Sequence, residues 1–348
     1  MERVRVAVFG AAGYGGIELL RLLRKHRFVE VVNLAGHTTA GQRLDEVYPH
    51  LAGLDEREIT DSDVERAARE AEVLFSALPH GTSMKFVAAA VEAGMQVFDF
   101  SADFRLRNRE TYEEYYCPHE APDLLSQAVY GLPELHRAQI AGAQLVAVPG
   151  CYPTGAILAL APAVREGLVA LDDLVVDSKS GVSGAGRSKL TLTTHFCEVD
   201  ESVSAYAIAA HRHQPEMEQE LSFCAGDAVR VTFSPHLLPM SRGILTTTYG
   251  RLTCEATAEE LYELYEAAYR DEPFVHVLPP AKYPATKHVT GTNFCRIGLT
   301  VDERAHRLIV VSAIDNLGKG LSGAAVQCLN VARGWPETTA LDDVAVWP

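Results

Sequence analysis

The N-terminal stretch of the chain places a strand-like run, a glycine-rich turn and an apolar helix pattern in immediate succession. Residues 4–9 (VRVAVF) are rich in β-branched side chains and run directly into the glycine-rich segment 10–16 (GAAGYGG). Leucines at helical spacing follow, and residues 29–35 (VEVVNLA) form a second strand-like run. Strand, glycine turn, helix and strand within about 35 residues make one βαβ unit. Such a unit requires parallel strands, and sheets of parallel strands are covered by helices on both faces.

The same alternation continues to about residue 150 and then changes character. Further apolar strands and a helix are expected at 71–77, 82–93 (the helix), 96–99 and 144–148. Beyond them the strand-like runs are longer and amphipathic, at 174–180, 228–234, 243–252, 293–301 and 307–314, with helices near 154–166, 215–223 and 257–269. The sequence therefore predicts an α/β protein with a Rossmann-type doubly wound parallel sheet in the first domain. The second domain is predicted to be α+β, with a mostly antiparallel sheet that has one free face.

Composition narrows the class of protein. The chain has 348 residues, enough for about two domains, and 47% hydrophobic with 22% charged residues is typical of a globular protein. A net charge of −15 argues against nucleic acid or an anionic membrane as a partner. The sequence has neither a spanning apolar run nor a signal-peptide pattern at its start. Seven scattered cysteines without a Cys-x-x-Cys pair favour reduced thiols and a cytoplasmic location.

The glycine segment is a candidate cofactor site. Gly10, Gly13 and Gly15, with Tyr14 between them, lie where a dinucleotide-binding turn delivers its pyrophosphate to a helix N-terminus. The spacing G-x-x-G-x-G differs from the usual G-x-G-x-x-G, so a tight structural turn is the alternative. After the second strand, Thr38 and Thr39 stand where NAD-binding proteins place a carboxylate, which favours NADP over NAD. A simple polar turn is the alternative there.

One of the seven cysteines lies in a sequence context that favours a reactive thiolate. Cys151 follows Pro149 and Gly150 at the end of a strand, and Pro153 suits the first turn of the apolar helix that comes next. A thiol at a helix N-terminus ionises more easily, and the thiolate is a strong nucleophile. We interpret Cys151 as the nucleophile and the other six cysteines as small apolar residues.

Seven segments together resemble a known family, the N-acetyl-γ-glutamyl-phosphate reductases of arginine biosynthesis. They are residues 10–16, 99–105 (DFSADFR), 130–134 (YGLPE), 149–154 (PGCYPT), 180–187 (SGVSGAGR), 211–216 (HRHQPE) and 316–320 (NLGKG). The resemblance covers essentially the whole chain in order, and the family is related to aspartate-semialdehyde dehydrogenase.

The resemblance implies that NADPH reduces an acyl phosphate to an aldehyde through a thioester on Cys151. It implies His211 as the acid/base, which as an imidazolium would favour the thiolate, and Glu216 as an orienting or substrate-binding carboxylate. For His213 a structural role is expected. A metal site at His211 and His213 has no further ligands to complete it, so no metal is expected. The resemblance also implies a homodimer or homotetramer.

Other residues of these motifs are assigned by the same resemblance. Arg105, Arg187 and Arg212 are candidates for the substrate's phosphate and carboxylate, and for each the alternative is a solvated or structural ion pair. The predicted cofactor residues are Gly10, Gly13, Tyr14, Gly15, Thr38, Thr39, Ser180, Gly181, Gly184, Asn316 and Lys319. Residues 1–150, completed by 316–348, are expected to bind NADP, and residues 151–315 to hold the catalytic and dimerisation functions. The Gly318-Lys319-Gly320 run lacks the Walker spacing, so it is not a phosphate loop.

Three other interpretations remain. A related enzyme could reduce aminoadipyl phosphate held on an acidic carrier protein, although that needs a basic docking patch and the chain is acidic. Another semialdehyde dehydrogenase, such as the aspartate enzyme, matches the motifs less well. A non-catalytic NADP-binding sensor on the same fold would have no need of a reactive Cys151.

Overall fold

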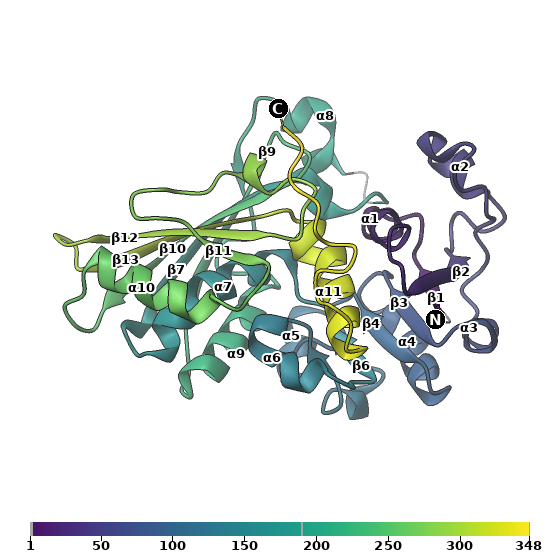
Figure 1. Ribbon diagram of the computed structural model, residues 1–348, viewed down its shortest axis with the longest axis horizontal. Coiled ribbons are helices and arrows are strands. Elements are labelled where there is room, and N and C mark those ends of the chain that lie inside the picture. Colours follow the sequence, from purple (N-terminus) through teal and green to yellow (C-terminus); the bar gives the residue numbers. More distant parts are fainter. Residues whose placement is uncertain (1–2, 189–190, 348) are drawn as a thin grey trace. The chain divides into compact units, whose positions relative to one another are not determined.

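The computed structural model describes residues 3–188 and 191–347 (Figure 1). The chain forms two compact units, Met1–Pro149 with Leu321–Leu341, and Gly150–Gly320 with Asp342–Pro348. We call them the first and the second unit. The chain therefore leaves the first unit one residue before Gly150 and returns to it after Gly320.

The first unit contains a six-stranded sheet in the order β2-β1-β3-β4-β6-β5, and its neighbouring strands pair in parallel. The strands are β1 (Val4–Phe9), β2 (Val29–Ala35), β3 (Val73–Ser76), β4 (Gln96–Asp99), β5 (Val129–Tyr130) and β6 (Leu145–Ala147). The helices are α1 (Tyr14–Leu23), α2 (Leu44–Val47), α3 (Val64–Glu70), α4 (Ser83–Glu92), α5 (Arg109–Tyr115), α6 (Pro133–Ile140) and α11 (Gly323–Ala332). The predicted doubly wound parallel domain is confirmed.

The C-terminal helix α11 belongs to this first unit and packs against α1 and α6. Ser322 Oγ donates a hydrogen bond of 2.8 Å to the carbonyl of Gly15, and the side chains of His26 and Asn330 form another of 2.8 Å. Because these partners are more than 300 positions apart in the 348-residue chain, the unit is complete only when its C-terminal segment has returned.

The second unit has a seven-stranded sheet in the order β11-β12-β13-β10-β7-β9-β8. The strands are β7 (Val169–Gly181), β8 (Ser204–Ala205), β9 (Val231–Leu238), β10 (Ile244–Leu252), β11 (Val275–Val277), β12 (Cys295–Asp302) and β13 (Arg307–Ile314). Most neighbours are antiparallel, as predicted, but β7 pairs with β9 and β11 with β12 in parallel. Alternating hydrophobicity shows which face of a strand is buried and not which way the strand runs, so these two pairs could not be predicted.

One face of this sheet is covered by helices. α7 (Cys151–Arg165) packs on β7, β10 and β13, and α10 (Ala258–Tyr269) packs on α7 (Figure 1). α8 (Phe196–Val199) and α9 (Gln214–Ala225) are further α-helices of this unit, and its short helical turns include Val182–Ala185 and Thr286–His288. Burial alternates along β10 from Ile244 to Leu252, so its other face stays half-exposed. The one-sided sheet predicted from the sequence is present.

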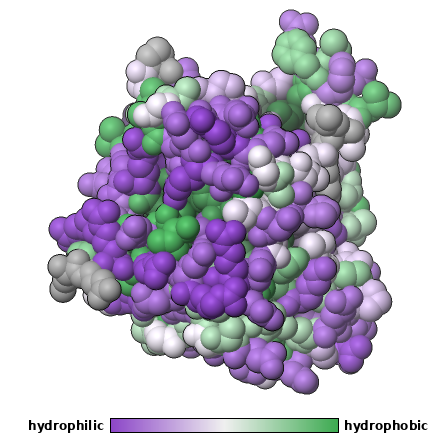
Figure 2. Space-filling model, turned by 90° about the vertical axis from the view of Figure 1, so that its right-hand side faces the viewer, coloured by the Kyte–Doolittle hydropathy of each residue, from purple (hydrophilic) through white to green (hydrophobic). Residues whose placement is uncertain are grey.

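The surface agrees with the composition. Hydrophilic side chains cover most of the face drawn in Figure 2, and hydrophobic ones gather in a few patches. Among residues 3–188 and 191–347, no helix is both long and apolar enough to cross a membrane.

Helix α7 contains a proline that is compensated from a neighbouring helix. Pro162 has no N–H, so the carbonyl of Leu158 one turn earlier loses its helical donor. The hydroxyl of Tyr269 on α10 donates to that carbonyl at 2.6 Å, and Tyr265 donates to the carbonyl of Ala159 at 2.7 Å. Two tyrosines of α10 thereby satisfy the buried backbone around Pro162.

We expect Tyr269→Phe to lower the free energy of unfolding by about 1–3 kcal/mol, because the Leu158 carbonyl is then buried without its donor. Urea denaturation of the variant and the parent protein measures the change. Tyr262→Phe, on the half-buried face of the same helix, is the control and should change stability by less than about 0.5 kcal/mol. Equal effects of the two substitutions would contradict the assignment.

Candidate active site

The glycine segment of the first unit forms a tight turn between β1 and α1. Gly10 has φ +79°, and a Cβ there would overlap the carbonyl of Ala77. A Cβ on Gly16 would overlap the carbonyl of Gly10. Gly13 is the N-cap of α1, and the first turn consists of the uncharged residues 14–17. This turn fits a pyrophosphate, because small residues leave it room and the helix N-terminus attracts its charge.

The other predicted cofactor residues of the first unit differ in how accessible they are. Tyr14 is 37% exposed, and Gly15 lies under Leu321, whose Cδ2 would be 2.9 Å from a Cβ on Gly15. After β2 the chain reads GHTTAG over residues 36–41, with Thr38 exposed and Thr39 half-buried. Thr39 Oγ1 lies against Gly36, so Thr38 is the more accessible hydroxyl. An uncharged loop at this position fits a 2′-phosphate better than a carboxylate would.

Cys151 is the first residue of α7 in the second unit, and its N-cap is Gly150. The side chain is half-buried, and all seven cysteines are free thiols. The Gly150 N–H donates to Glu216 Oε1 at 2.7 Å, which fixes the backbone just before the thiol. Glu216 is only 1% exposed. In the structure, therefore, Glu216 orients the backbone at Gly150.

His211 lies in a small aromatic enclosure in the same unit. Its ring centroid is 5.5 Å from the rings of Tyr152 and Tyr206, 5.2 Å from Phe233 and 4.8 Å from His213. Burial, assisted by the charge of Arg212, lowers the pKa of His211 to about 4. Near pH 7 the ring is therefore neutral, because its charged form would lose hydration without gaining a counter-charge. The imidazolium assumed in the sequence analysis is disfavoured.

A backbone contact defines which nitrogen of His211 carries the proton. The N–H of His213 donates to His211 Nδ1 at 3.1 Å. Since Nδ1 accepts, the neutral ring carries its hydrogen on Nε2, an assignment made from the hydrogen-bond partner. His211 thus has an N–H donor at Nε2. His213 contributes to this arrangement through its backbone N–H.

Tyr152 and Tyr206 lie near the thiol of Cys151, and the sequence did not single out Tyr206. The hydroxyls of Tyr152 and Tyr206 are 2.9 Å apart, and the charge of Cys151 contributes to raising the pKa of Tyr206 to about 12, mainly a result of burial. Tyr206 is held by β8, where its N–H donates to the carbonyl of Pro235. No periodic or motif signal marks Tyr206, because it is positioned by a strand of only two residues, Ser204–Ala205.

The three candidate arginines have different environments. Arg105 is 4% exposed, and its Nε and Nη2 donate to the carbonyls of Val148 and Phe100, each at 2.7 Å. It therefore joins the segments that follow β4 and β6 in the first unit. Arg187 and Arg212 belong to the second unit and are exposed.

The remaining candidates belong to the second unit. Ser180 is 3% exposed, and its hydroxyl donates to the carbonyl of Gly181, while Gly184 is exposed. Asn316 accepts from Gly243 N–H at 2.7 Å and donates to Ser183 Oγ at 2.8 Å. Lys319 is fully buried, and its Nζ lies 5.8 Å from the centre of the Phe274 ring.

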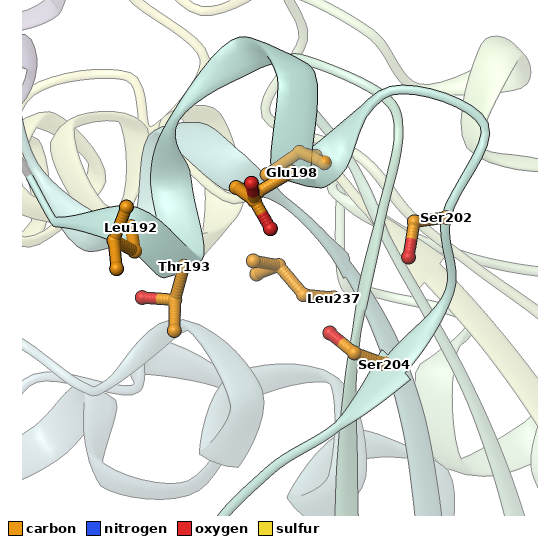
Figure 3. Close-up of a pocket in the computed structure, with 7 residues that line it drawn as sticks. Leu192, Thr193, Glu198, Ser202, Ser204 and Leu237 are labelled. Carbon is orange, nitrogen blue, oxygen red and sulfur yellow. The ribbon is translucent and has the colours of Figure 1, made fainter.

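A separate shallow pocket lies in the second unit (Figure 3). It has a volume of about 190 Å³ and is lined by Leu192, Thr193, Glu198, Val199, Ser202, Ser204 and Leu237. Its lining contains neither Cys151 nor His211. In the part of the chain that the structure describes, no group of three His, Cys, Asp or Glu side chains is arranged to hold a metal.

Comparisons with known proteins agree with this arrangement. Residues 5–143 match the family model "Semialdehyde dehydrogenase, NAD binding domain", and residues 151–316 match "Semialdehyde dehydrogenase, dimerisation domain". Aspartate semialdehyde dehydrogenase II from Vibrio cholerae has a similar structure, with a TM-score of 0.73 and 16% identity over 96% of this chain and 99% of that one. The chain belongs to the semialdehyde dehydrogenase family.

The curated relatives define the branch. The chain is 50% identical to N-acetyl-γ-glutamyl-phosphate reductase of Pelotomaculum thermopropionicum over 99% of both proteins. It is 48% identical to the protein of the same name from Acetivibrio thermocellus over 97% of both. Within the family the chain belongs to the N-acetyl-γ-glutamyl-phosphate reductases, so the resemblance stated from its motifs is confirmed.

Proposed function

We propose that this protein reduces N-acetyl-γ-glutamyl phosphate with NADPH, reversibly, to N-acetylglutamate 5-semialdehyde and phosphate, a step of arginine biosynthesis. The observation that carries the proposal is Cys151 at the N-terminus of α7, in a chain 50% identical over 99% of its length to a reductase of that name. The relatives support a free substrate over one held on a carrier protein, and an enzyme over a sensor.

NADPH is the proposed cofactor, held by the first unit. The glycine turn at Gly10–Gly16, which leads into the N-terminus of α1, and the uncharged loop at Thr38 and Thr39 support it. An aspartate semialdehyde dehydrogenase from Candida albicans, whose structure is described as "with NADP", has a TM-score of 0.71 and covers 95% of this chain and 99% of that one. We propose that residues 1–150 and 316–348 provide the cofactor site. The resemblance adds Ser180, Gly181 and Gly184, which belong to the second unit, to the proposed cofactor residues.

The chemistry begins at Cys151. The thiolate, favoured by the N-terminus of α7, attacks the acyl carbon, and the C–O bond to phosphate breaks to leave a thioester. NADPH, when bound, supplies a hydride to the carbon of that thioester. The resulting thiohemiacetal oxyanion collapses, the C–S bond breaks, and the aldehyde leaves with the thiolate restored.

We propose that His211 stabilises two negatively charged groups as a hydrogen-bond donor, the thiolate of Cys151 and the oxyanion of the thiohemiacetal. Its neutral ring carries the proton on Nε2 because Nδ1 accepts from the His213 N–H. We propose that Nε2–H donates first to the thiolate and then to the oxygen of the thiohemiacetal as negative charge develops there. Arg105, Arg187 and Arg212 are the proposed partners of the substrate's phosphate and carboxylate.

We also propose that the protein works as a homodimer or homotetramer in the cytoplasm. Support comes from the dimerisation-domain match and from exposed apolar side chains in the second unit, with Leu192 77%, Phe196 74% and Ile208 55% exposed. The mass of the protein in solution distinguishes one, two and four copies. A reactive thiol that must stay reduced suits the cytoplasm.

The reaction and its cofactor are tested together. In the reverse direction, with phosphate and N-acetylglutamate semialdehyde, we expect NADP to give a clearly higher kcat/KM than NAD. Thr38→Asp should reverse part of that preference, because a carboxylate repels a 2′-phosphate and binds ribose hydroxyls. Equal kcat/KM values for the two cofactors in the parent protein would contradict the assignment.

We expect Cys151→Ser to abolish turnover while NADPH binding stays within a few-fold, since serine cannot form the thioester at a useful rate. Activity assays and cofactor titration measure the two effects. Cys224→Ser, at a half-buried free thiol of the same unit, is the matched control and should retain most of the activity. If the Cys151 variant kept more than a few per cent of activity, the thioester mechanism would be wrong.

His211→Asn should reduce turnover by about 10²–10⁴-fold and move the pH profile of Cys151 alkylation upward, because a donor to the thiolate is lost. His213→Asn should do neither, since His213 reaches His211 through its backbone N–H. Iodoacetamide rates against pH measure both variants. A shift in the His213 variant alone would mean that the two roles are interchanged.

A further inference from the structure

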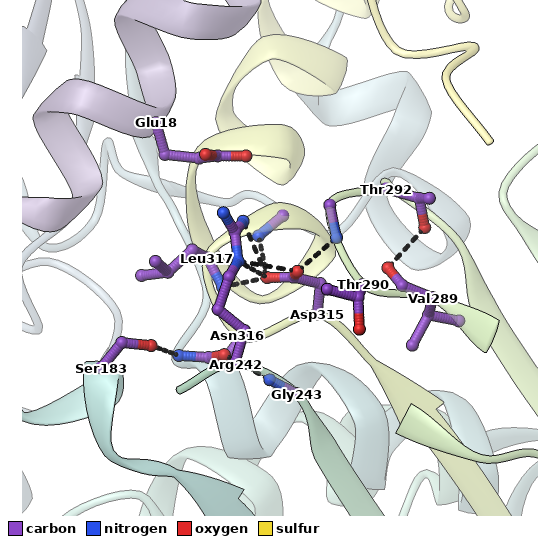
Figure 4. Close-up of polar contacts among 12 residues, drawn as sticks. Glu18, Ser183, Arg242, Gly243, Val289, Thr290, Thr292, Asp315, Asn316 and Leu317 are labelled. Carbon is purple, nitrogen blue, oxygen red and sulfur yellow. Dashed lines mark hydrogen bonds and ion pairs between the residues drawn. The ribbon is translucent and has the colours of Figure 1, made fainter. Parts of the chain in front are cut away.

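A buried carboxylate joins three separate segments of the second unit. Asp315, at the end of β13, is fully buried and accepts hydrogen bonds from the N–H groups of Gly291 (2.6 Å), Leu317 (2.8 Å) and Gly318 (3.0 Å). Arg242 donates to it from Nε at 2.9 Å and from Nη2 at 3.1 Å (Figure 4). Five donors from three segments therefore meet on one side chain.

Arg242 also lies in a segment, residues 240–243, that is hydrogen-bonded to the loop at 181–184; we call this pairing the clamp. Around it, the N–H of Gly181 donates to Gly243 O at 2.9 Å and the N–H of Val182 to Met240 O at 2.9 Å. A Cβ on Gly181 would lie 2.8 Å from Arg242 N, so the two segments are in close contact. The loop that contains Ser180, Gly181 and Gly184 is thus held by the segment whose arginine binds Asp315.

Asn316 reinforces this clamp from the other side. Its amide oxygen accepts from Gly243 N–H, and its amide nitrogen donates to Ser183 Oγ (Figure 4). Because Asn316 directly follows Asp315, the position of the carboxylate determines where this bridge lies. The hydrogen bonds of Asp315 and Asn316 together fix the loop at 181–184.

The segment that follows Asp315 reaches the thiol. A Cβ on Gly318 would overlap the carbonyl of Thr292, so the chain makes its closest approach to that turn at a glycine. The N–H of Gly320 donates to Asp315 O at 2.9 Å, and a Cβ on Gly320 would lie 2.9 Å from Cys151 Cβ. The turn built on Asp315 therefore packs directly against the nucleophilic residue.

We propose that Asp315, paired with Arg242, is a positioning residue that sets the place of Cys151, through Gly320, and of the 181–184 loop, through Asn316. The proposal rests on the role proposed above for Cys151. A carboxylate is needed because three backbone N–H groups and a guanidinium converge on it. An asparagine would turn its own N–H₂ toward at least one of these donors and would no longer offer Arg242 a negative charge at this position.

The experiment compares Asp315→Asn, Arg242→Gln and the double variant with the parent protein. We expect each single variant to lower kcat by about 10²-fold, with a smaller change in KM, as a displaced nucleophile does. The rate of Cys151 alkylation by iodoacetamide, followed by mass spectrometry of the peptide, should fall in parallel. The double variant removes both charges, so it should regain melting temperature while kcat stays low.

The matched control is Asp173→Asn, which breaks the ion pair with Arg307 (3.0 Å) near the opposite end of β7 from Ser180. It should leave kcat and the alkylation rate of Cys151 unchanged. Recovery of kcat together with melting temperature in the double variant would overturn the proposal, because the pair would then serve stability alone. Unchanged alkylation and kcat in Asp315→Asn would also overturn it.

If Asp315→Asn and Arg242→Gln do not fold, a variant that keeps the positive charge at position 242 still tests the proposal. Arg242→Lys preserves the charge on Asp315 but loses the two-pronged contact. It should melt close to the parent protein and still show lower kcat and slower alkylation, and parent-like values of both would overturn the proposal. Alkylation is measured without turnover, so an active Cys151→Ser variant would contradict the proposed nucleophile separately.

Discussion

The buried helix α7 is the constraint on which the rest of the second unit depends. Every residue of it from Tyr152 to Val164 is buried, so its N-terminus, and Cys151 with it, cannot shift without disturbing the core. The helix is fixed at the thiol end by the Glu216 contact to Gly150 and at its middle by the Tyr265 and Tyr269 hydroxyls. The N-terminus of a helix favours a thiolate, and here packing holds that N-terminus in a fixed place.

Local patterns made part of this site predictable. The helix N-terminus at Cys151 could be predicted because its signals, Gly150 and Pro153, are neighbours in sequence. The glycine turn at Gly10 could be predicted for the same reason. The partners of Asp315 could not, because Gly291 and Arg242 are brought to it by strand pairing over long separations. The neutral state of His211 also depends on tertiary burial by Tyr152, Tyr206 and Phe233.

Three of the buried charged side chains of the second unit lie in the segments discussed above. Glu216, Asp315 and Lys319 are 1%, 0% and 0% exposed, and all three lie within the second unit. Burial of an ionised group is unfavourable unless hydrogen bonds and counter-charges replace water. Asp315 has such replacements in its five donors, and Glu216 accepts from Gly150. A hydrophobic side chain could fill the same volume but could not fix the direction of an N–H group, which is what these carboxylates do.

The same reasoning applies to the place of Cys151, the proposed nucleophile, beside two points at which the chain passes from one unit to the other. The chain passes from one unit to the other after Pro149, after Gly320 and after Leu341. The first two of these points lie next to residues that contact each other, because Gly320 packs on Cys151. Each of these two points is fixed within the second unit by a carboxylate that accepts a backbone N–H, Glu216 at Gly150 and Asp315 at Gly318. Two covalent connections anchored beside one thiol hold Cys151 in place more firmly than a single loop would, since displacement requires both carboxylate contacts to break together.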